Sequence, residues 1–368
     1  MQILRGLAAV LVVLHHFNQM LPWPNVGLVL FGYDGDSGVD IFFLISGFVM
    51  VRSTEKPEHA RPGAFVVRRF FRVVPLAEIC TLLYFLLLWG KPTLNVLLRS
   101  LCFIPLLPSD PPKFGWSLVP QMWTLSYEIV FYALFGLALI FCHRRRVAVV
   151  IGLIFSSIFL FQFLLGGPFS WRPDGVHLPT AHDGILPVEV MGVLGNPILL
   201  EFVAGILLAW GYGKWEALLR QPECRLPLRL TAIVLLGAFL AIYFSPYEAG
   251  HGLLNKHGYG SVCLVTAALL LELSLAQQPA NQPTGPLLRI CLWLGAISYP
   301  LYLVHLGIVG SIVGLLPTAA VRALSTGLLG FVVFIAVSIG LAALLHTVVE
   351  RPFLNWGKRL IGDRVPSA

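Results

Sequence analysis

The sequence predicts an all-α, polytopic membrane protein with about ten transmembrane helices and both termini in the cytoplasm. Hydrophobic residues make up 57% of the 368 residues and charged residues only 12%, whereas a soluble domain has about 25% charged residues. The mean hydropathy of the chain, +0.82, is also high. We expect one transmembrane domain over residues 1–353 and a short cytoplasmic tail over 354–368.

Ten apolar runs account for this prediction, because a helix needs about 20 residues to cross a bilayer and somewhat fewer if its flanks snorkel. The predicted spans are 3–21, 38–54, 74–90, 118–142, 147–167, 197–213, 228–245, 259–276, 289–315 and 325–349. Residues 94–107 form a further apolar piece that could be a re-entrant or interfacial helix.

The distribution of Lys and Arg predicts the orientation, because these residues favour the cytoplasmic side of membrane proteins. With the amino terminus inside, 19 of the 25 Lys and Arg residues lie in cytoplasmic segments and six lie outside. The net charge of +7 suits basic cytoplasmic loops. No basic run interleaved with aromatic residues indicates a nucleic-acid partner, so the expected surroundings are a lipid bilayer.

The first span carries two ionisable residues, Arg5 and His16, that lie eleven positions apart. At about 100° per residue they share one helical face, roughly 16 Å apart along the axis. Ionisable groups inside a membrane are costly and usually face a site or a partner. We therefore expect a functional role, although Arg5 could be a boundary anchor and His16 could lie at the outer boundary.

No metal site is expected from local spacing. His15 and His16 are adjacent, so they cannot present two ligands from one helical face. The six cysteines include no CxxC pair and indicate neither a zinc site nor a disulfide framework.

Asp40 lies at the outer end of the second span. Its carboxylate could orient and charge an imidazole by accepting the second N–H of the ring. It could equally cap the start of the helix, where negative charge suits the helix dipole, and the two roles are compatible.

Three arginines, Arg68, Arg69 and Arg72, precede the third predicted span, and Pro75 suits the first turn of that helix. Guanidinium groups at a cytoplasmic helix start can bind phosphate. The alternative is an ordinary anchor or a contact with anionic lipid.

The fourth span contains Glu128, with Thr124 and Tyr132 four residues away on the same face. Its other polar or aromatic neighbours are Trp123, Ser126 and Tyr127. A buried carboxylate needs a partner, and Arg5 or a histidine is the one we expect. The alternative is a structural hydrogen bond between helices.

Two further groups lie near the carboxyl terminus. Ser298 and His305 share a helical face with Tyr302 between them, and Pro300 interrupts the helix. His346 and Glu350, at positions i and i+4, predict an intramembrane salt link.

These stretches, taken in order, resemble the membrane-bound acyltransferase 3 family, in particular exopolysaccharide and lipopolysaccharide O-acetyltransferases. The residues that carry the resemblance are Arg5 and His16, Gly38-Val39-Asp40 before FFLISGF, Arg69-Phe70-Phe71-Arg72 with Pro75, Trp123 to Glu128 with Phe131-Tyr132, and Ser298-Tyr299 with Leu301, Tyr302 and His305.

The resemblance implies transfer of an acyl group, commonly acetyl, from cytoplasmic acyl-CoA as co-substrate to a hydroxyl of a cell-surface or lipid-linked glycan. It implies that His16 is the catalytic histidine, with Arg5 as its motif partner, and that Arg69 and Arg72 are donor-binding or structural residues. An imidazole with a pKa near 6.5 suits the general base that this reaction needs.

From their positions we add Asp40 and Glu128 as catalytic candidates and Arg68 as a donor-binding one. The candidates for a substrate pocket are Trp123, Ser126, Tyr127, Ser298, Tyr302 and His305. Two alternative functions remain open at this point. One is acylation of a lipid or a small hydroxylated metabolite, and the other is a proton-coupled transporter or flippase.

Overall fold

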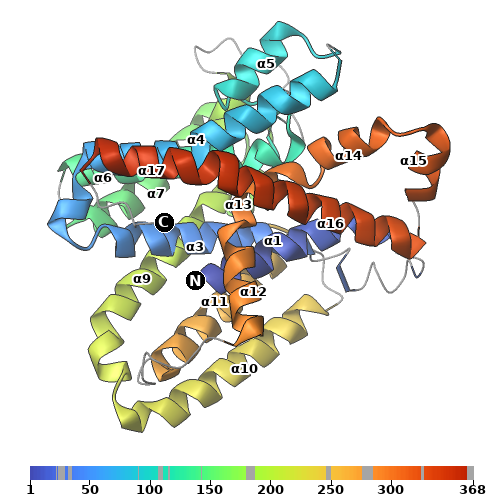
Figure 1. Ribbon diagram of the computed structural model, residues 1–368. Helices are drawn as coiled ribbons and strands as arrows, with labels where there is room; N and C mark the ends of the chain where they lie inside the picture. Colours follow the sequence, from blue (N-terminus) through green and yellow to red (C-terminus); the bar gives the residue numbers. More distant parts are fainter. Residues whose placement is uncertain are drawn as a thin grey trace.

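The structure is a computed structural model that describes residues 1–21, 23, 30–31, 35–89, 91–106, 111–114, 117–141, 143–179, 187–245, 250–275, 285–324 and 327–362. The described residues are helical or irregular, and they include no strand. In a bilayer this is the expected outcome for such apolar segments, since a helix satisfies its backbone hydrogen bonds internally. The α-helical fold class is therefore confirmed (Figure 1).

The α-helices are α1 (Gln2–Phe17), α3 (Gly38–Ser53), α4 (Pro62–Leu87), α5 (Leu94–Leu101), α6 (Trp123–Phe141), α7 (Arg146–Leu165), α8 (Val188–Gly195), α9 (Leu200–Leu219), α10 (Arg225–Tyr243), α11 (Lys256–Leu275), α12 (Pro286–Ala296), α13 (Ser298–Val304), α14 (Gly307–Gly314), α15 (Thr318–Leu324), α16 (Gly327–Leu345) and α17 (Arg351–Leu360). Short 3₁₀ turns include η1 (Asn18–Met20), η3 (Gly35–Ser37), η4 (Pro57–Ala60), η5 (Pro120–Met122), η6 (Pro173–Gly175), η7 (Pro197–Leu199) and η8 (Pro222–Cys224), and η9 (His346–Glu350) is a π-helical turn.

Eight helices in the described ranges are long and apolar enough to cross a membrane, and the bent pair α12–α13 makes a ninth. The sequence predicted about ten. The difference is α3, whose 16 residues extend about 24 Å at 1.5 Å per residue. That length is less than the hydrocarbon thickness of about 30 Å. Because most of α3 is enclosed by other helices, it does not need to reach both membrane surfaces by itself.

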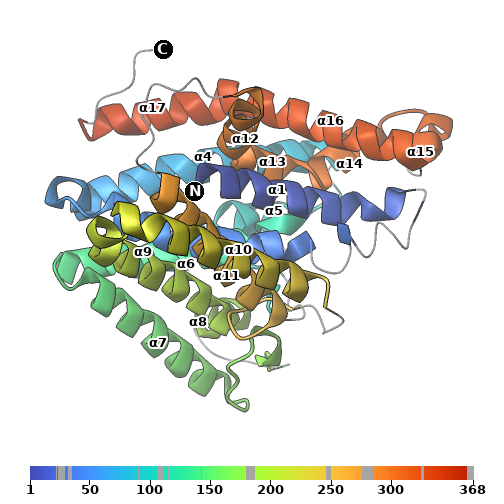
Figure 2. The same cartoon turned by 90° about the horizontal axis from the view of Figure 1, so that it is seen from below.

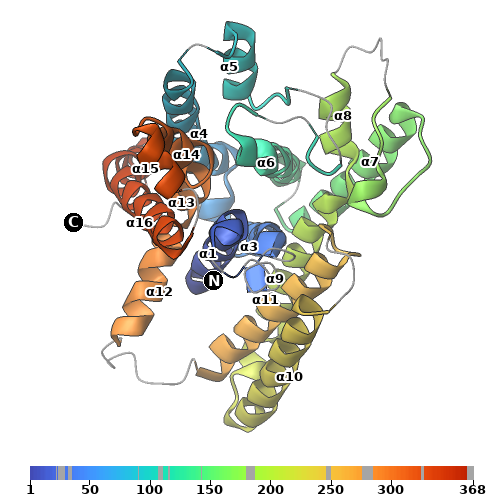
Figure 3. The ribbon, with the colours of Figure 1, turned by 90° about the vertical axis from the view of Figure 1, so that its right-hand side faces the viewer.

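α3 and α1 lie in the middle of the molecule, with the remaining helices arranged around them (Figure 3). α3 and α9 approach each other so closely that a Cβ atom on Gly47 would lie 2.2 Å from the carbonyl oxygen of Phe202. On the facing helix, a Cβ on Gly205 would lie 2.0 Å from the carbonyl oxygen of Leu44. Small residues permit this backbone contact, as they do in many membrane helix pairs.

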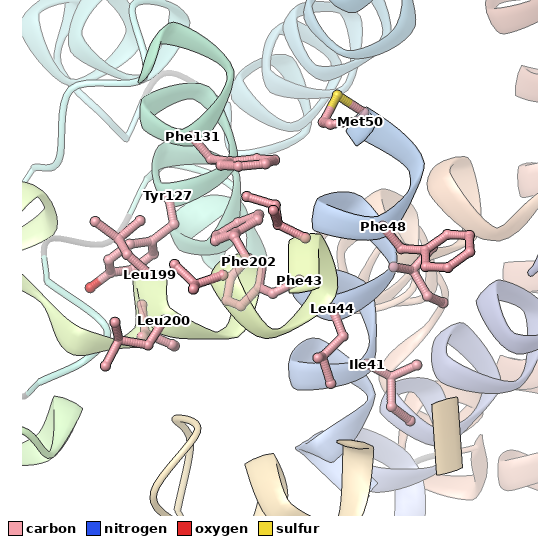
Figure 4. Close-up of a cluster of buried hydrophobic side chains, with 14 of the residues drawn as sticks. Ile41, Phe43, Leu44, Phe48, Met50, Tyr127, Phe131, Leu199, Leu200 and Phe202 are labelled. Atoms are coloured by element: carbon pink, nitrogen blue, oxygen red, sulfur yellow. The ribbon is translucent and has the colours of Figure 1, made fainter. Parts of the chain in front are cut away.

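Large apolar side chains surround this crossing and fix α6 against the same pair of helices (Figure 4). Phe43 of α3, Phe131 of α6 and Phe202 of α9 form one aromatic stack, with ring centroids 4.7 Å apart for Phe43–Phe202 and 4.3 Å apart for Phe131–Phe202. Such pairs contribute about 0.5–1.5 kcal/mol beyond burial of their area. The stack therefore holds α3 in place relative to α6.

α4 begins at Pro62, twelve residues earlier than the predicted third span. Pro75 lies inside this helix and not in its first turn, so that prediction was wrong. The three arginines interrupted the apolar pattern without interrupting the helix. They consequently lie within α4, where Arg69 and Arg72 share a face one turn apart.

The ninth predicted span, 289–315, is broken. α12 and α13 meet at a 57° bend three residues before Pro300. Proline lacks an N–H and its ring clashes with the carbonyl four residues earlier, here Ala296 at the end of α12. A second break follows at His305 and Leu306, before α14.

The tenth predicted span continues further than expected. α16, η9 and α17 follow one another without a gap from Gly327 to Leu360, and Figure 2 shows them as one long rod on the side opposite α7. Residues 353 and 354, at the predicted boundary between domain and tail, therefore both lie within α17. The division into a domain over 1–353 and a tail over 354–368 stays a prediction, and residues 363–368 lie outside the described ranges.

Candidate active site

Two cavities lie beside α1, and different ionisable residues line them. The first, which we call the arginine cavity, has an empty volume of about 750 Å³. Its charged lining residues are Arg5 of α1, Arg69 and Arg72 of α4, and Glu128 of α6. Three guanidinium groups against one carboxylate make this cavity suited to an anionic ligand.

The arginines of this cavity have different partners. Arg72 Nη1 lies 2.5 Å from Glu350 Oε1, and His346 Nδ1 lies 2.6 Å from the other oxygen of the same carboxylate. The predicted His346–Glu350 link is thus confirmed, and it extends to α4. The Arg5 guanidinium forms no hydrogen bond or ion pair with the described residues, although it lies within electrostatic range of Glu128 and Glu350. Its guanidinium is therefore available to a ligand.

Glu128 does not pair directly with Arg5 or with a histidine, contrary to our prediction. It accepts hydrogen bonds from Tyr132 Oη and, at 3.3 Å, from Ser46 Oγ of α3. The alternative of a hydrogen bond between helices describes Glu128 better, because Ser46 belongs to α3 whereas Glu128 and Tyr132 both belong to α6. Its carboxylate still lines the arginine cavity.

The second cavity, which we call the histidine cavity, has an empty volume of about 460 Å³. It is lined by His15 and His16 at the far end of α1, and by Asp36 and His251. Two residues, Val39 and Tyr302, line both cavities. The cavities therefore meet at these two side chains, with Arg5 on one side and His16 on the other.

Tyr302 is held at this junction by hydrogen bonds from several groups. Its hydroxyl donates to the Gln121 carbonyl at 3.1 Å and lies 3.0 Å from Thr124 Oγ1. Gln121 Nε2 donates in return to the carbonyls of Tyr302 and Leu303, at 3.1 and 2.7 Å. Gln121 was not singled out from the sequence, because a lone amide before an apolar helix carries no distinctive pattern.

His16 and His305 form an imidazole pair that fixes which ring nitrogen is available. His305 Nδ1 lies 2.8 Å from the Tyr302 carbonyl, to which it can only donate, so its Nε2 is an acceptor when the ring is neutral. His16 Nδ1 lies 2.8 Å from the Val12 carbonyl and 3.2 Å from His305 Nε2, so it carries the hydrogen. The lone pair of neutral His16 is consequently on Nε2.

Asp40 binds an imidazole, as one of our two interpretations required, and the imidazole is His251. His251 Nδ1 donates to Asp40 Oδ2 at 2.8 Å, and the backbone N–H of Gly252 donates to Asp40 Oδ1 at 3.0 Å. Gly252 has φ +103°, and a Cβ there would lie 2.3 Å from Pro173, so only glycine fits this turn. Asp40 is fully buried within α3.

Asp36 lies on the other side of His251. Asp36 Oδ2 is 3.4 Å from His251 Nε2, and Asp36 Oδ1 is 3.5 Å from His257 Nε2. Burial lowers the pKa of His251, but the charge of Asp40 and the hydrogen bond with Asp36 outweigh it and raise that pKa to about 10. Burial raises the pKa of Asp36, yet the hydrogen bond from His251 and the nearby imidazole charges hold it well below its usual value.

The other candidate residues fall into two groups. Trp123 lines the histidine cavity, and its ring packs on His251 with centroids 5.6 Å apart. Asp40 and His305, described above, line neither cavity, and the same is true of four further predicted residues, namely Arg68, Ser126, Tyr127 and Ser298. Three of these four bind backbone carbonyls instead: Ser126 donates to Phe103, Tyr127 to Pro112 and Ser298 to Gly295.

A family profile described as an acyltransferase domain matches residues 1–347. The chain belongs to the acyltransferase 3 family. It is thus an integral membrane acyltransferase with multiple spans, and the transporter alternative is not retained.

Two relatives match most of the chain. The exopolysaccharide production protein ExoZ of Rhizobium meliloti (strain 1021) is 29% identical over 340 residues, which cover 88% of this chain and 91% of ExoZ. The acyltransferase MdmB of Streptomyces mycarofaciens is 27% identical over 353 residues, which cover 91% of this chain and 84% of MdmB. No solved structure matches the chain significantly.

Proposed function

We propose that this acyltransferase moves an acyl group, in the simplest case acetyl, from acyl-CoA in the cytoplasm to a hydroxyl of a cell-surface or lipid-linked glycan. The observation that carries the proposal is the meeting of the arginine cavity and the histidine cavity at Val39 and Tyr302. One cavity suits an anionic donor and the other holds an imidazole base. Such an arrangement supports a group transfer, in which donor and base must lie next to each other.

The arginine cavity is the proposed donor site. The nucleotide part of CoA carries phosphates, which Arg5, Arg69 and Arg72 can bind by charge-assisted hydrogen bonds. The excess of Lys and Arg on one side of the predicted spans supports a cytoplasmic location of this cavity and of both termini. The same reasoning favours the inner membrane of a bacterium.

His16 is the proposed general base. Its Nε2 takes the proton of the acceptor hydroxyl, and the hydroxyl oxygen attacks the thioester carbonyl to form a tetrahedral intermediate. When the C–S bond breaks, the CoA thiolate leaves and takes the proton from the His16 imidazolium. His305 Nε2, 3.2 Å from His16 Nδ1, stabilises the positive charge on the His16 ring in between.

Tyr302 is the proposed contact for the thioester. Tyr302 and Thr124, whose hydroxyls lie 3.0 Å apart, both line the arginine cavity. A hydroxyl can donate to the oxygen on which negative charge develops, and such donors are worth about 10²–10³ in rate. The pantetheine arm would reach His16 past Tyr302 and Val39, which requires no covalent intermediate on the protein.

The acceptor class rests on the similarity to ExoZ, an exopolysaccharide production protein. The alternative acceptors are lipids and small hydroxylated metabolites. All three share the hydroxyl that His16 would deprotonate, so the geometry of the histidine cavity supports each of them. The acylated product distinguishes the three acceptor classes, because it is an acylated glycan, an acylated lipid or a small ester.

The experiment is transfer of radiolabel from acetyl-CoA in membranes that contain the full chain and the surface glycans of the host. We expect label in the glycan fraction with wild type, and a loss of about 10²–10⁴ in rate with His16→Ala. His15→Ala is the matched control. It removes the neighbouring imidazole, which also lines the histidine cavity but contacts the Phe31 carbonyl and not His305, and it should lose far less activity than His16→Ala does.

Label in a lipid or small-molecule fraction would replace the glycan by that acceptor and leave the base assignment intact. Equal rates for wild type and His16→Ala would refute the role of His16. Loss of activity in His15→Ala that matches the loss in His16→Ala would do so as well, because it would show that any change at this end of α1 is damaging.

A further inference from the structure

Two imidazoles and one carboxylate from three separate segments converge beside the histidine cavity. They belong to Asp36 of η3, His251 of the loop before α11, and His257 of α11. Their ligand atoms all lie within 4.8 Å of one another. Neither the proposed base nor the proposed donor site uses these three residues.

The geometry of this group is that of metal ligands. Two ligands placed about 2.0–2.1 Å from a tetrahedral ion are about 3.3 Å apart. Asp36 Oδ2 lies 3.4 Å from His251 Nε2, and the other oxygen of the same carboxylate, Oδ1, lies 3.5 Å from His257 Nε2. Both rings thus turn the same nitrogen, Nε2, toward Asp36.

A second carboxylate lies behind the two rings. Asp40 Oδ2 is 2.8 Å from His251 Nδ1 and 3.9 Å from His257 Nδ1. A carboxylate on the remote nitrogen of a ligating histidine is typical of metal sites, because it fixes the tautomer and the orientation of the ring. Asp40 would fill this role for His251.

Burial and charge favour a cation at this position. The side chains of His251 and His257 are 5% and 2% exposed. With the two imidazoles neutral, as metal ligation requires, the carboxylates of Asp36 and Asp40 leave two negative charges for a divalent ion to balance, and Lys113 is a further charged residue on the cavity wall.

We propose that Asp36, His251 and His257 bind one divalent transition-metal ion. Two imidazoles and one carboxylate form the donor set of many catalytic zinc sites and of non-haem iron sites. The ion would replace the proton between Asp36 and the imidazoles. A fourth position would face the histidine cavity, which Asp36 and His251 line together with His16.

The test is metal binding by the full chain in detergent, after treatment with a chelator. Co²⁺ is the probe, since a tetrahedral site with nitrogen and oxygen ligands gives visible absorption, and Zn²⁺ is then added as a competitor. We expect one Co²⁺ per chain in wild type. Asp36→Asn and His257→Gln should each weaken binding about tenfold or more, because each removes or alters one of three ligands.

His177→Gln is the matched control, because it removes an exposed imidazole outside the cluster and should bind Co²⁺ as wild type does. X-ray absorption of Zn²⁺-loaded wild type is a second readout that needs no variant, and we expect two imidazole ligands. Failure of wild type to bind one equivalent, unchanged binding in both cluster variants, or a spectrum without imidazole ligands would overturn the proposal.

Discussion

Replacement of His305 by phenylalanine tests the most specific element of the proposed reaction, the support of His16 by a second imidazole. His305 is fully buried and places Nε2 3.2 Å from His16 Nδ1. Phenylalanine has a similar shape and can keep the edge contact with Phe17, whose ring centroid lies 6.3 Å away. It removes the acceptor while it leaves His16 in place.

The magnitude follows from the change in charge on His16. A neutral hydrogen bond contributes about 0.5–1.5 kcal/mol, and one to a charged group about 1.5–3 kcal/mol. Protonation of His16 in the transition state therefore strengthens the bond to His305 by about 1–1.5 kcal/mol, which corresponds to about tenfold in rate. We expect kcat to fall about tenfold in His305→Phe, with KM for acyl-CoA unchanged.

The assay is initial-rate transfer of labelled acetyl with purified protein in lipid nanodiscs, with thermal unfolding as a check on the fold. His305→Gln is the rescue variant, because its amide oxygen can accept from His16 Nδ1 and should restore part of kcat. An unchanged kcat in His305→Phe would refute the reasoning. So would a change confined to KM, or an equal loss in the glutamine and phenylalanine variants.

Two further predictions concern the donor site and the helix crossing. Arg69→Gln should raise KM for acetyl-CoA by about ten- to hundredfold, since a charge-assisted hydrogen bond is worth about 1.5–3 kcal/mol. It should leave KM for acetyl-pantetheine unchanged, because that donor lacks the nucleotide. An equal rise in KM for both donors would contradict phosphate binding. Gly205→Ala should lower the free energy of unfolding by about 1–3 kcal/mol in thermal denaturation, because the new Cβ would lie 2.0 Å from the Leu44 carbonyl oxygen. Gly211→Ala on the same helix meets no atom within 4 Å, so a similar loss in that control would count against the close packing of α3 and α9.

Features that depend on helical period could be predicted from the sequence. The eleven-residue spacing of Arg5 and His16 predicted one helical face, and the two residues indeed lie at the two ends of α1, each lining one cavity. The spacing of His346 and Glu350 predicted their contact, which is present at 2.6 Å. In both cases the relevant geometry lies within one helix.

Features that depend on packing between helices could not be predicted in this way. Asp40 contacts His251 across 211 positions of sequence, and nothing in the pattern around His251 distinguishes it from a loop histidine. The expected partner of Glu128 was wrong for the same reason, because its partner on α3 is determined by how α3 meets α6. Hydropathy also misplaced the start of α4, since charged residues end an apolar run but do not end a helix.

The place where the two cavities meet, at Tyr302, bears on how the thioester would be protected from water. A thioester in a wet cavity is open to hydrolysis, and enzymes that transfer acyl groups must keep water from competing with the acceptor. Tyr302 is fixed by Thr124 of α6 and Gln121 of η5, while its own helix, α13, ends at Val304, immediately before His305, the residue that supports His16. In the proposed reaction, a donor that displaces the Tyr302 side chain would also act on the turn that holds His305. The same movement that admits the thioester would then adjust the base, so that acyl transfer is favoured only when the donor fills the junction.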